Sequence, residues 1–447
     1  MSQPILLTDK QIQDYLVNGY TTVKTELPAG LHQRIHRKIE TLYANEGNPG
    51  NEILSKVPEL HKILEDPLVH GSLCSLLGPD YIIHPHRHCH QNISGSVGQN
   101  MHQDSYEDDQ NVRHHRTRWA MAFYYPQDTT LDMGPTSILP ATQYYTSNVE
   151  AQKREELPLC GQAGTVTIVH YDLWHRAMPN SNENDRFMVK FLFTRMSEPH
   201  KPTWDHQNSS WDHVNNDSSM AVCIRAWDWM RGAEKTDLIC RDSPQKLKLK
   251  LRSDSEKDRI EAVYSLADLG EESIPTLVKA LESQAEKYLE ENTEKPHTNP
   301  VQLDATVGFS SIGQSAIPCL LDLLSDDRWW LRAAAADILG DMGEKASESV
   351  PFLADLLNDS SPWVQRNAIE ALGNIGPNSA EAVLKLRISL NAPESWVRHN
   401  AALTLAKIGP KAKEAIPELE TSIEDEAGYA SSHAQIALDR ITNRNSF

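Results

Sequence analysis

The sequence predicts two parts of different architecture, a β-barrel with flanking helices and, behind it, an α-solenoid. The β-barrel is predicted from short segments, apolar or alternating in pattern, that are separated by turns. Such segments are typical of strands. They are Thr117–Tyr125, Thr136–Leu139, Thr165–His170 and Arg186–Thr194. The α-solenoid is predicted from a helical pattern that repeats from about residue 255. At 447 residues the chain is long enough for two or three domains with separate cores.

The composition of the whole chain limits the classes of partner. A net charge of -19 argues against nucleic acid and against an anionic membrane surface as the main partner. No apolar run approaches the roughly 20 residues that a membrane span needs, and the N-terminus lacks an apolar secretory core. The six cysteines show no CxxC pattern, which favours reduced thiols. We therefore expect a cytoplasmic protein.

The segments that precede Tyr81 are expected to surround the barrel. Thr8 can cap a first helix, and Thr21–Val23 is predicted to form a short strand. Leu31–Asn45 is predicted to be an amphipathic helix, and Glu52–Leu77 is largely helical in pattern. None of these segments shows residues typical of a reaction site, so we expect them to pack on the outside.

The next predicted strand, Tyr81–Ile93, contains histidines at alternate positions. They are His84, His86, His88 and His90, and on a strand all four would face one way. Three interpretations stay open: a second metal site, a substrate pocket to which His86 and His88 contribute, and a partly solvated sheet face. Closed metal sites need ligands from several elements, which disfavours the first. Pro85 indicates a sheet edge or a bulge.

A His-x-Asp pair is the strongest candidate for chemistry. His102 and Asp104 alternate along the chain, so both side chains point to one side of an extended segment. His175 lies far enough downstream of Asp104 to come from another strand. Two histidines and one carboxylate are the ligand set typical of non-haem iron. A second such pair, His170 and Asp172, is interpreted as strand and turn residues that position His175.

Arginines near these positions suggest sites for anionic groups. Arg186 begins the apolar strand that follows His175, which places it beside the predicted metal site. Its planar guanidinium can bind a carboxylate through two parallel hydrogen bonds. A dicarboxylate co-substrate that chelates the metal at one end needs such a partner at the other. Arg113 and Arg116, in a basic loop, are weaker candidates for contacts with an anionic substrate group.

Taken together, these segments resemble the phytanoyl-CoA dioxygenase family over roughly residues 5–200. The residues that carry the resemblance are His102-Gln103-Asp104, Trp119, the stretch GPTSILPATQ from Gly134 and the stretch GTVTIVHYDLWHRAMPNSNENDR from Gly164. The resemblance implies a double-stranded β-helix of the jelly-roll or cupin-like type. It also implies Fe(II) on His102, Asp104 and His175, 2-oxoglutarate on Arg186, and Trp119 near the co-substrate. The family's GPL-x-x-x-PGSH segment differs here, which affects the shape of the pocket.

The same resemblance implies a reaction. An enzyme of this kind hydroxylates a C–H bond of a small molecule with O2, while 2-oxoglutarate is decarboxylated to succinate and CO2. A carboxylate at position 104, in place of Gly or Ala, favours hydroxylation over halogenation because no position is left for a halide. The substrate is not identified by the family, and the acidic chain shows no clear basic patch for a CoA group.

The region between the barrel and the solenoid is rich in tryptophan and polar residues. Residues 201–229 are expected either to cover the pocket as a lid or to pack as a tail on the barrel. Asp242–Asp254 is charged and is interpreted as a linker. We therefore expect an oxygenase domain over residues 1–242, a linker over 243–256 and a helical repeat domain over 257–447.

The repeat shows in glycines that end helices and prolines that open the next ones. The glycines are Gly270, Gly313, Gly343, Gly376 and Gly409, and the prolines are Pro275, Pro318, Pro351 and Pro417. The last three glycines are evenly spaced, at a period typical of an α-solenoid. The repeats resemble short HEAT repeats of the phycobilisome-lyase type. Gln284–Asn299 is expected to be a loop inserted between repeats.

Solenoids mostly bind partners or brace a neighbouring domain, so two alternatives to a small-molecule hydroxylase stay open. In one, the repeats hold a protein partner, or a second copy of the chain, and the barrel acts only as a binding module. In the other, the bound protein is itself the substrate, which makes the chain a protein hydroxylase. The complete set of His102, Asp104, His175 and Arg186 argues against a barrel without activity.

Overall fold

The structure is a computed structural model that describes residues 3–105, 114–212, 220–236, 242–291 and 303–443. The chain forms two compact units. Unit 1 comprises residues 1–104, 115–195 and 199–236, and unit 2 comprises residues 105–114, 196–198 and 237–447. Each unit is described by itself. The domain limits expected at residues 242 and 257 stay a prediction.

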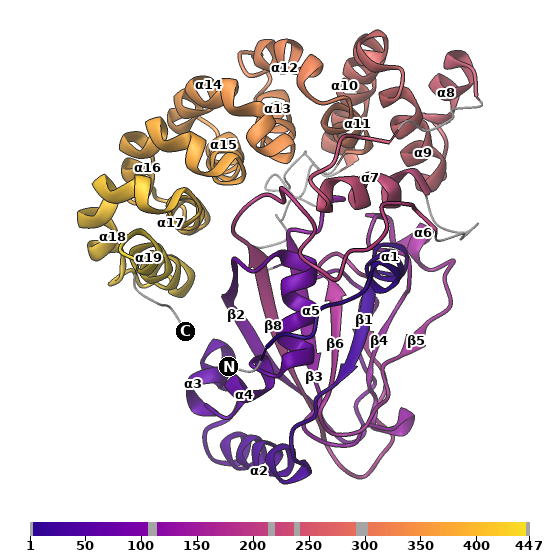
Figure 1. Cartoon of the computed structure of the whole chain (residues 1–447), viewed down its shortest axis with the longest axis vertical. Helices are drawn as coiled ribbons and strands as arrows, with labels where there is room; N and C mark the ends of the chain where they lie inside the picture. The colour runs from indigo at the N-terminus through magenta and orange to yellow at the C-terminus, as the bar shows by residue number, and fades with distance from the viewer. Residues whose placement is uncertain (1–2, 106–113, 213–219, 237–241, 292–302, 444–447) are drawn as a thin grey trace. The chain divides into compact units, whose positions relative to one another are not determined.

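Unit 1 is built on two antiparallel sheets that form a double-stranded β-helix, as predicted (Figure 1). The larger sheet has the strand order β1-β6-β3-β8-β2, and the smaller one has the order β5-β4-β7. The strands of the larger sheet are β1 (Tyr20–Lys24), β6 (Thr165–His170), β3 (Trp119–Tyr124), β8 (Arg186–Arg195) and β2 (Tyr81–Asn92). Those of the smaller sheet are β5 (Leu157–Pro158), β4 (Thr136–Ile138) and β7 (His175–Ala177).

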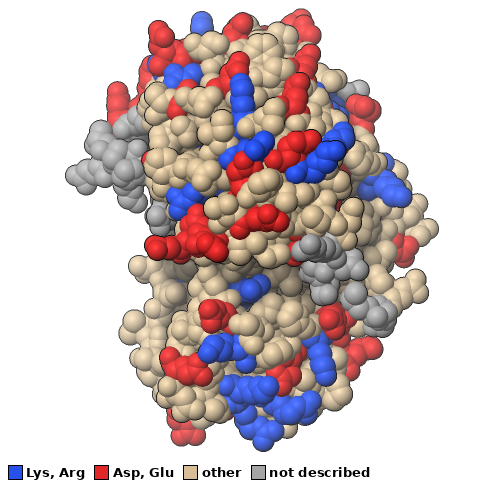
Figure 2. All heavy atoms as spheres, turned by 90° about the vertical axis from the view of Figure 1, so that its left-hand side faces the viewer, with Lys and Arg blue, Asp and Glu red and all other residues tan. Residues whose placement is uncertain are grey.

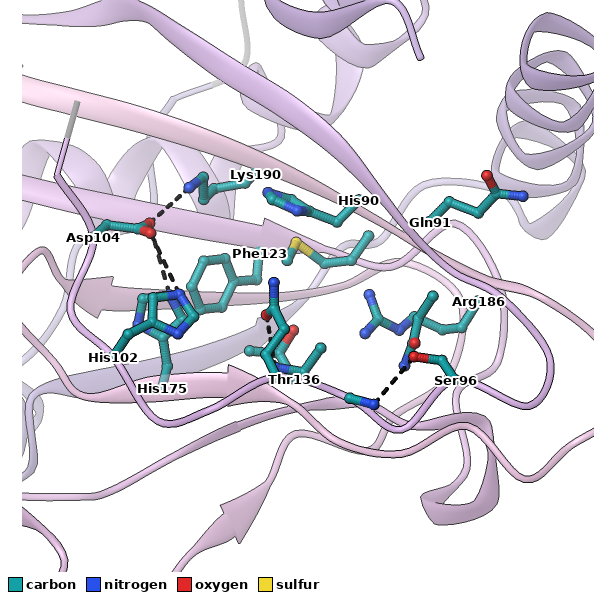
Figure 3. Close-up of a pocket in the computed structure, with 15 residues that line it drawn as sticks. His90, Gln91, Ser96, His102, Asp104, Phe123, Thr136, His175, Arg186 and Lys190 are labelled. Atoms are coloured by element: carbon teal, nitrogen blue, oxygen red, sulfur yellow. Dashed lines mark hydrogen bonds and ion pairs between the residues drawn. The ribbon is translucent and has the colours of Figure 1, made fainter. Parts of the chain in front are cut away.

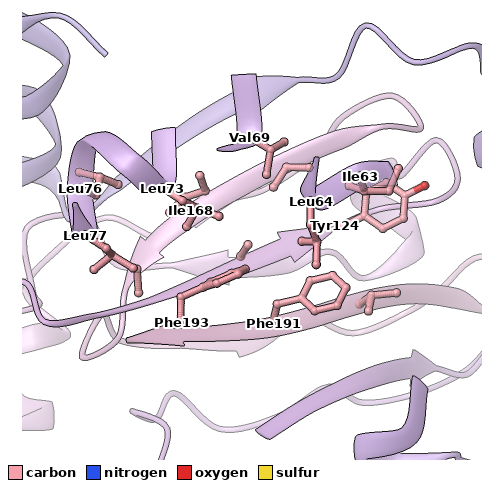
Figure 4. Packing of buried hydrophobic residues seen from close by; sticks show 14 of the residues in the cluster. Ile63, Leu64, Val69, Leu73, Leu76, Leu77, Tyr124, Ile168, Phe191 and Phe193 are labelled. Carbon is pink, nitrogen blue, oxygen red and sulfur yellow. The ribbon is translucent and has the colours of Figure 1, made fainter. Parts of the chain in front are cut away.

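The helices of unit 1 are α1 (Asp9–Asn18), α2 (Ala29–Glu46), α3 (Ile53–Lys56), α4 (Leu60–Leu64), α5 (Pro67–Leu77), α6 (Asn148–Ala151) and α7 (Met220–Met230). All of them except α6 share one core with the larger sheet, whereas Ala151 of α6 packs with Leu139 and Trp174. Figure 4 shows Leu73 and Leu77 of α5 facing Phe193 and Ile168 of the sheet, and all four are fully buried. Burying one such side chain contributes about 1.5–3 kcal/mol. This core fixes the sheet, and the opposite face of the sheet stays available for a site.

Strand β2 is the edge of its sheet, and its pairing with β8 shifts register between Ile83 and Arg87. Pro85 lies in this irregularity, as the sequence indicates. Beyond the shift, the rings of His86 and His88 lie 4.8 Å apart and those of His88 and His90 lie 6.2 Å apart. His84 instead packs on Trp119, with 5.4 Å between ring centroids. The row of four histidines expected on a regular strand is therefore interrupted at the bulge.

Helix α2 carries a small basic cluster formed by Arg34, Arg37 and Lys38, with Lys56 of α3 beside it. In Figure 2, Lys and Arg side chains gather at the lower end of the face in view, where α2 lies in Figure 1, with acidic side chains among them. Lys56 pairs with Glu46 at 2.7 Å, and Lys38 pairs with Glu59. Acidic partners thus neutralise part of this cluster, unlike a surface that binds nucleic acid.

The tryptophan-rich residues after β8 pack on helix α1. Trp204 and Trp227 are buried, with ring centroids 5.2 Å apart, and belong to the same core as Leu16 of α1. The indole N–H of Trp204 donates to Asp9 at 2.6 Å. Among the described residues of 201–229, this arrangement favours a tail packed on the barrel over a lid.

Unit 2 consists of paired helices from α8 to α19. The helices are α8 (Pro244–Lys250), α9 (Glu256–Ala267), α10 (Ile274–Glu291), α11 (Asp304–Ile312), α12 (Ile317–Leu323), α13 (Trp329–Met342), α14 (Val350–Asp355), α15 (Pro362–Ile375), α16 (Val383–Ser389), α17 (Ser395–Ile408), α18 (Ile416–Ser422) and α19 (Gly428–Ile441). All five repeat glycines have φ between 65° and 82°, a region that favours glycine, so each helix can end where the spacing predicts. The α-solenoid is therefore confirmed.

Two details of unit 2 differ from expectation. Part of the segment interpreted as a linker is helix α8, because Leu247 within it and Leu251 directly after it, one helical turn apart, are both buried. The expected loop Gln284–Asn299 is wrong in its first half, since α10 continues to Glu291. Leu281 and Ala285 are both fully buried, so the apolar stripe of α10 runs beyond the predicted helix end.

Candidate metal centre

The structure brings His102, Asp104 and His175 together between the two sheets. His175 opens strand β7, and His102 pairs with it in an isolated antiparallel bridge. The ligand atoms of the three side chains lie within 4.8 Å of one another, close enough to hold one ion. Among the described residues, no other group of three His, Cys, Asp or Glu side chains is arranged in this way.

Backbone carbonyls orient both histidines. Nδ1 of His102 lies 2.8 Å from the carbonyl of Asn100, and Nδ1 of His175 lies 2.9 Å from the carbonyl of Leu173. Each Nδ1 therefore carries the proton. Each Nε2 is unprotonated, can bind a metal ion through its lone pair, and lies 3.7 Å from the Asp104 carboxylate. Burial lowers the pKa of His175 to about 4, so its imidazole is neutral and suited to bind a metal.

Asp104 is held by an ion pair that the sequence did not reveal. Lys190 Nζ lies 2.6 Å from Asp104 Oδ2. Burial alone would raise the pKa of Asp104, but the charge and the hydrogen bond of Lys190 hold that pKa well below its usual range. Gln103, between the two ligands, donates to the carbonyl oxygens of Tyr145 and Asp172 and so anchors the segment.

Arg186 lies in the same cavity and is 1% exposed. Its Nε and Nη2 donate to the carbonyl of Gly134 at 3.1 and 2.8 Å. Its Nη1 is buried and has no hydrogen-bond partner among the described residues. A buried, charged donor without a partner is costly, so a ligand that supplies an acceptor here would be bound favourably.

The cavity has a volume of about 200 Å³. Figure 3 shows His102, Asp104 and His175 at one end and Arg186 at the other, with Phe123 and Thr136 between them. Its further lining residues are His90, Gln91, Asn92, Ser96, Gly98, Gln99, Ala177, Met188 and Lys190. Strands of both sheets thus supply its walls. The end with the histidines and Asp104 can bind a cation, and the end with the Arg186 guanidinium can bind an anion.

The other predicted site residues lie elsewhere. Trp119 begins strand β3, while Phe123, two inward-facing positions further on, lines the cavity. Arg116 lies 5.9 Å from the ring of Trp229, and Arg113 lies outside the described residues. His86 and His88 do not line the cavity itself, but the charges of Lys190 and Asp104 act on both imidazoles. Their roles as substrate contacts, and that of Trp119, stay predictions.

The second His-x-Asp pair has a different setting. His170 ends strand β6, and its Nδ1 accepts from the backbone N–H of Asp172 at 3.2 Å. The carbonyl of Asp172 accepts from Gln103, which lies between the ligands His102 and Asp104. These contacts are those of residues that shape the turn before His175, the role that the sequence favours.

Comparison with protein families decides the nature of this part of the chain. Residues 36–188 match the family model of phytanoyl-CoA dioxygenase. The chain carries a phytanoyl-CoA dioxygenase domain. The matched stretch contains all four of His102, Asp104, His175 and Arg186, and it ends before Lys190. The recognition made from the sequence is therefore confirmed.

The helical part matches two other family models. Residues 308–360 and 350–439 match HEAT repeats, and residues 258–283 match the PBS lyase HEAT-like repeat. The phytanoyl-CoA dioxygenase domain is thus followed by HEAT repeats in one chain. In the described part of the chain, none of the helices is both long enough and apolar enough to cross a membrane.

Solved structures that resemble part of the chain align with less than half of it. The non-heme alpha-ketoglutarate-dependent carbocyclase SnoK from nogalamycin biosynthesis is 15% identical, with 44% of this chain and 88% of SnoK covered and a TM-score of 0.37. HygX from Streptomyces hygroscopicus, with nickel and 2-oxoglutarate bound, is 12% identical, with coverage of 42% and 88% and a TM-score of 0.34. A search of curated proteins gives no match. The assignment of the dioxygenase domain therefore rests on the family model and on the topology.

Proposed function

We propose that unit 1 is an Fe(II)- and 2-oxoglutarate-dependent oxygenase. The observation that carries this proposal is the unpartnered Nη1 of Arg186 in the cavity that also holds His102, Asp104 and His175, all within the described residues. Two imidazole nitrogens and a carboxylate suit non-haem iron and leave coordination positions open. The free guanidinium N–H suits a carboxylate at the other end of the same cavity. A co-substrate with a chelating end and a distal carboxylate satisfies both ends at once.

Each residue then has a distinct task. His102 and His175 offer Nε2, because their Nδ1 protons are held by backbone carbonyls, and Asp104 offers an oxygen. Arg186 binds the distal carboxylate of 2-oxoglutarate and is itself fixed by the Gly134 carbonyl. Phe123 and Met188 line the cavity and keep part of its wall apolar. When bound, iron and 2-oxoglutarate supply the activation of O2, with release of succinate and CO2.

We further propose that the reaction is hydroxylation of a C–H bond in a small molecule. Asp104 occupies the position that a halogenase leaves open for a halide, which favours transfer of oxygen. The imidazoles of His86 and His88, near the charges of Asp104 and Lys190, are the proposed substrate contacts on strand β2. Burial lowers the pKa of His86 to about 3, so this contact is neutral and can accept as well as donate a hydrogen bond.

The test is anaerobic addition of Fe(II) and then 2-oxoglutarate to the metal-free chain, with the weak visible charge-transfer band of the chelate as the readout. We expect a band in the wild type, none in His175→Ala, and a band that needs more 2-oxoglutarate in Arg186→Ala. Arg176→Ala is the matched control, since Arg176 forms its bidentate pair with Glu156 and does not line the cavity. Absence of a band in the wild type at saturating concentrations would rule the proposal out.

A protein substrate or partner is the second candidate, and exposed apolar residues on the solenoid favour it. Phe352 of α14 is 48% exposed, and Leu384 and Ile388 of α16 are 62% and 67% exposed. We propose that these outer helices take part in binding a protein. Proteins captured by the full chain are compared with those captured by a variant with Asp at all three positions, and mass spectrometry then searches for an added oxygen atom. An oxidised protein lost with the variant supports this candidate, whereas identical captured sets contradict it.

We place the chain in the cytoplasm, with domain limits near residues 242 and 257. Among the described residues, Cys74, Cys89, Cys160, Cys223 and Cys319 form no disulfide with one another, which is usual for a reducing compartment. Limited proteolysis that cuts first outside residues 242–257 would contradict the proposed limits.

A further inference from the structure

Lys190 is a buried lysine in the middle of an apolar strand. It lies on the inner face of β8, in the same alternating row as Arg186 and Met188, and is 5% exposed. In the register of the sheet it lies opposite Phe123 on one side and His88 on the other. Strand pairing therefore fixes its position inside the barrel, and Figure 3 shows its amine directed at Asp104.

The ammonium of Lys190 makes an ion pair with the proposed metal ligand Asp104 at 2.6 Å. Within the described residues, the proposed ligand set contains a single carboxylate together with two imidazoles. Lys190 thus cancels the one negative charge that this set offers to a metal ion. A divalent cation entering the site meets a donor set whose single negative charge is balanced by the fixed positive charge of Lys190.

We propose that Lys190 makes metal binding depend on an anionic co-substrate. This inference rests on the proposed function. The repulsion between a divalent ion and a buried ammonium is strong because little solvent screens it. Because Lys190 neutralises Asp104, the site lacks negative charge for a metal ion. The two carboxylates of 2-oxoglutarate supply it. Metal and co-substrate therefore strengthen each other's binding, and by linkage the factor is the same in either order of addition.

A role in orientation alone predicts the opposite effect of removing Lys190. If its hydrogen bond only oriented Asp104, its loss would weaken metal binding, as loss of an outer hydrogen bond to a metal ligand commonly does. If its charge dominates, the loss strengthens binding of the metal alone. The sign of one change in affinity thus separates the two roles.

The experiment measures Mn(II) affinity by titration calorimetry, without and with saturating 2-oxoglutarate, in the full chain. We expect Lys190→Met and Lys190→Gln to bind Mn(II) alone on the order of tenfold more tightly than the wild type. We also expect 2-oxoglutarate to strengthen Mn(II) binding less in both variants than in the wild type. Lys190→Gln keeps a hydrogen-bond donor without the charge, and Lys190→Arg, which keeps the charge, should resemble the wild type.

Lys153→Met is the control for loss of a lysine from an ion pair. Lys153 pairs with Glu150 at 2.9 Å and does not line the cavity, so its loss should leave both affinities unchanged. Thermal melting of the metal-free variants identifies any that does not fold, and Gln replaces Met in that case. Unchanged or weaker Mn(II) binding in the neutral variants would overturn the role of Lys190. Failure of the wild type to bind Mn(II) and 2-oxoglutarate would instead overturn the proposed function.

Discussion

Arginines in the two units of this chain are buried to different depths and are used differently. In the solenoid, Arg332 donates from Nε and Nη2 to Asp359 and from Nη1 to the carbonyls of Asp326 and Asp327. Arg398 repeats this pattern further along the solenoid, with Asp425 as its acid. In the barrel, Arg186 donates to Gly134, and its Nη1 is left without a partner among the described residues.

The difference separates residues that hold a fold together from residues that await a ligand. Every nitrogen of Arg332 is satisfied by its own chain, so its charge links neighbouring helices. The guanidinium of Arg186 is more deeply buried and yet incompletely bonded, and it faces a cavity. Burial of a charged group is common to both units. What distinguishes the site is an unused donor atom in the same cavity as the possible metal ligands, and each prediction below tests that distinction.

The largest effect is expected for Arg186→Met. Loss of a buried, charged hydrogen-bond donor should weaken 2-oxoglutarate binding by about 3 kcal/mol, or more than a hundredfold. Stability should change little, because the Gly134 carbonyl still accepts from Asn92 at 2.8 Å and the cost of burying a charge disappears. The measurements are 2-oxoglutarate titration of the Fe(II) chelate band and denaturant unfolding. A large loss of stability with unchanged affinity would place Arg186 among the structural arginines.

Arg332→Met should give the reverse result. Asp359, whose side chain is 7% exposed, would remain buried without its partner, so unit 2 should lose about 2–3 kcal/mol of unfolding free energy. The chelate band should be unaffected. Arg328→Met is the control, since Arg328 also pairs with acids but its side chain is 39% exposed, and its loss should cost less than about 1 kcal/mol. Equal losses of stability from both variants would mean that the buried ion pair of Arg332 stabilises unit 2 no more than a surface ion pair does.

Residue spacing and the resemblance to the dioxygenase family together predicted the architecture and singled out four residues that line one cavity. Strand Thr165–His170 forms over the residues predicted, because Gly164 with φ of 92° starts it and a run of buried β-branched residues continues it. The i, i+2 geometry of His102 and Asp104 is local, so it could be read without the fold. Such local rules fail where a partner comes from elsewhere in the chain, as the carbonyl of Gly134 does for Arg186.

Lys190 shows what a closer reading could have found. A lysine within the apolar run Phe187–Phe193, on the same alternating face as Arg186, has to point into the barrel. That pattern is visible in the sequence, but the identity of its partner is not. Helix α8 was missed for a similar reason, because its apolar residues Leu247 and Leu251 are few and lie among charges. In both cases one or two residues decide the local structure, and the average composition of the segment does not reveal them.

Gly134→Ala is expected to affect stability and co-substrate binding together. Gly134 has φ of 63°, and a Cβ there would lie 2.4 Å from Asn92 Nδ2 and 2.6 Å from the carbonyl oxygen of Met178. We expect a loss of about 1–2 kcal/mol in stability and weaker 2-oxoglutarate binding, because the carbonyl that holds Arg186 must move. Gly376→Ala is the matched control in the solenoid, with φ of 73° and nothing within 4 Å of the added atom. Equal effects of both changes would exclude a specific role for the Gly134 carbonyl.

The smallest effect concerns pH and should not differ between the units. Burial lowers the pKa of His433 in the solenoid to about 4 and that of His86 in the barrel to about 3. The folded state therefore binds these protons less readily than the unfolded chain, so each neutral imidazole contributes stability that is complete above pH 6.5 and is lost as the pH falls towards the folded pKa. His433, whose ring lies 5.6 Å from that of His399, should account for about half a kcal/mol of the stability lost between pH 7 and pH 6.

His433→Gln should reduce that loss, and so should His86→Gln, as measured by denaturant unfolding at several pH values. Exposed His61 offers a control, since His61→Gln removes a histidine from the surface of a helix and not from a core. Because burial acts alike in the two units, a depressed histidine pKa by itself does not indicate a site, whereas the unused nitrogen of Arg186 does. If His86→Gln altered the pH dependence of stability and His433→Gln did not, burial would not act alike in the two units. The barrel histidines would then indicate the site.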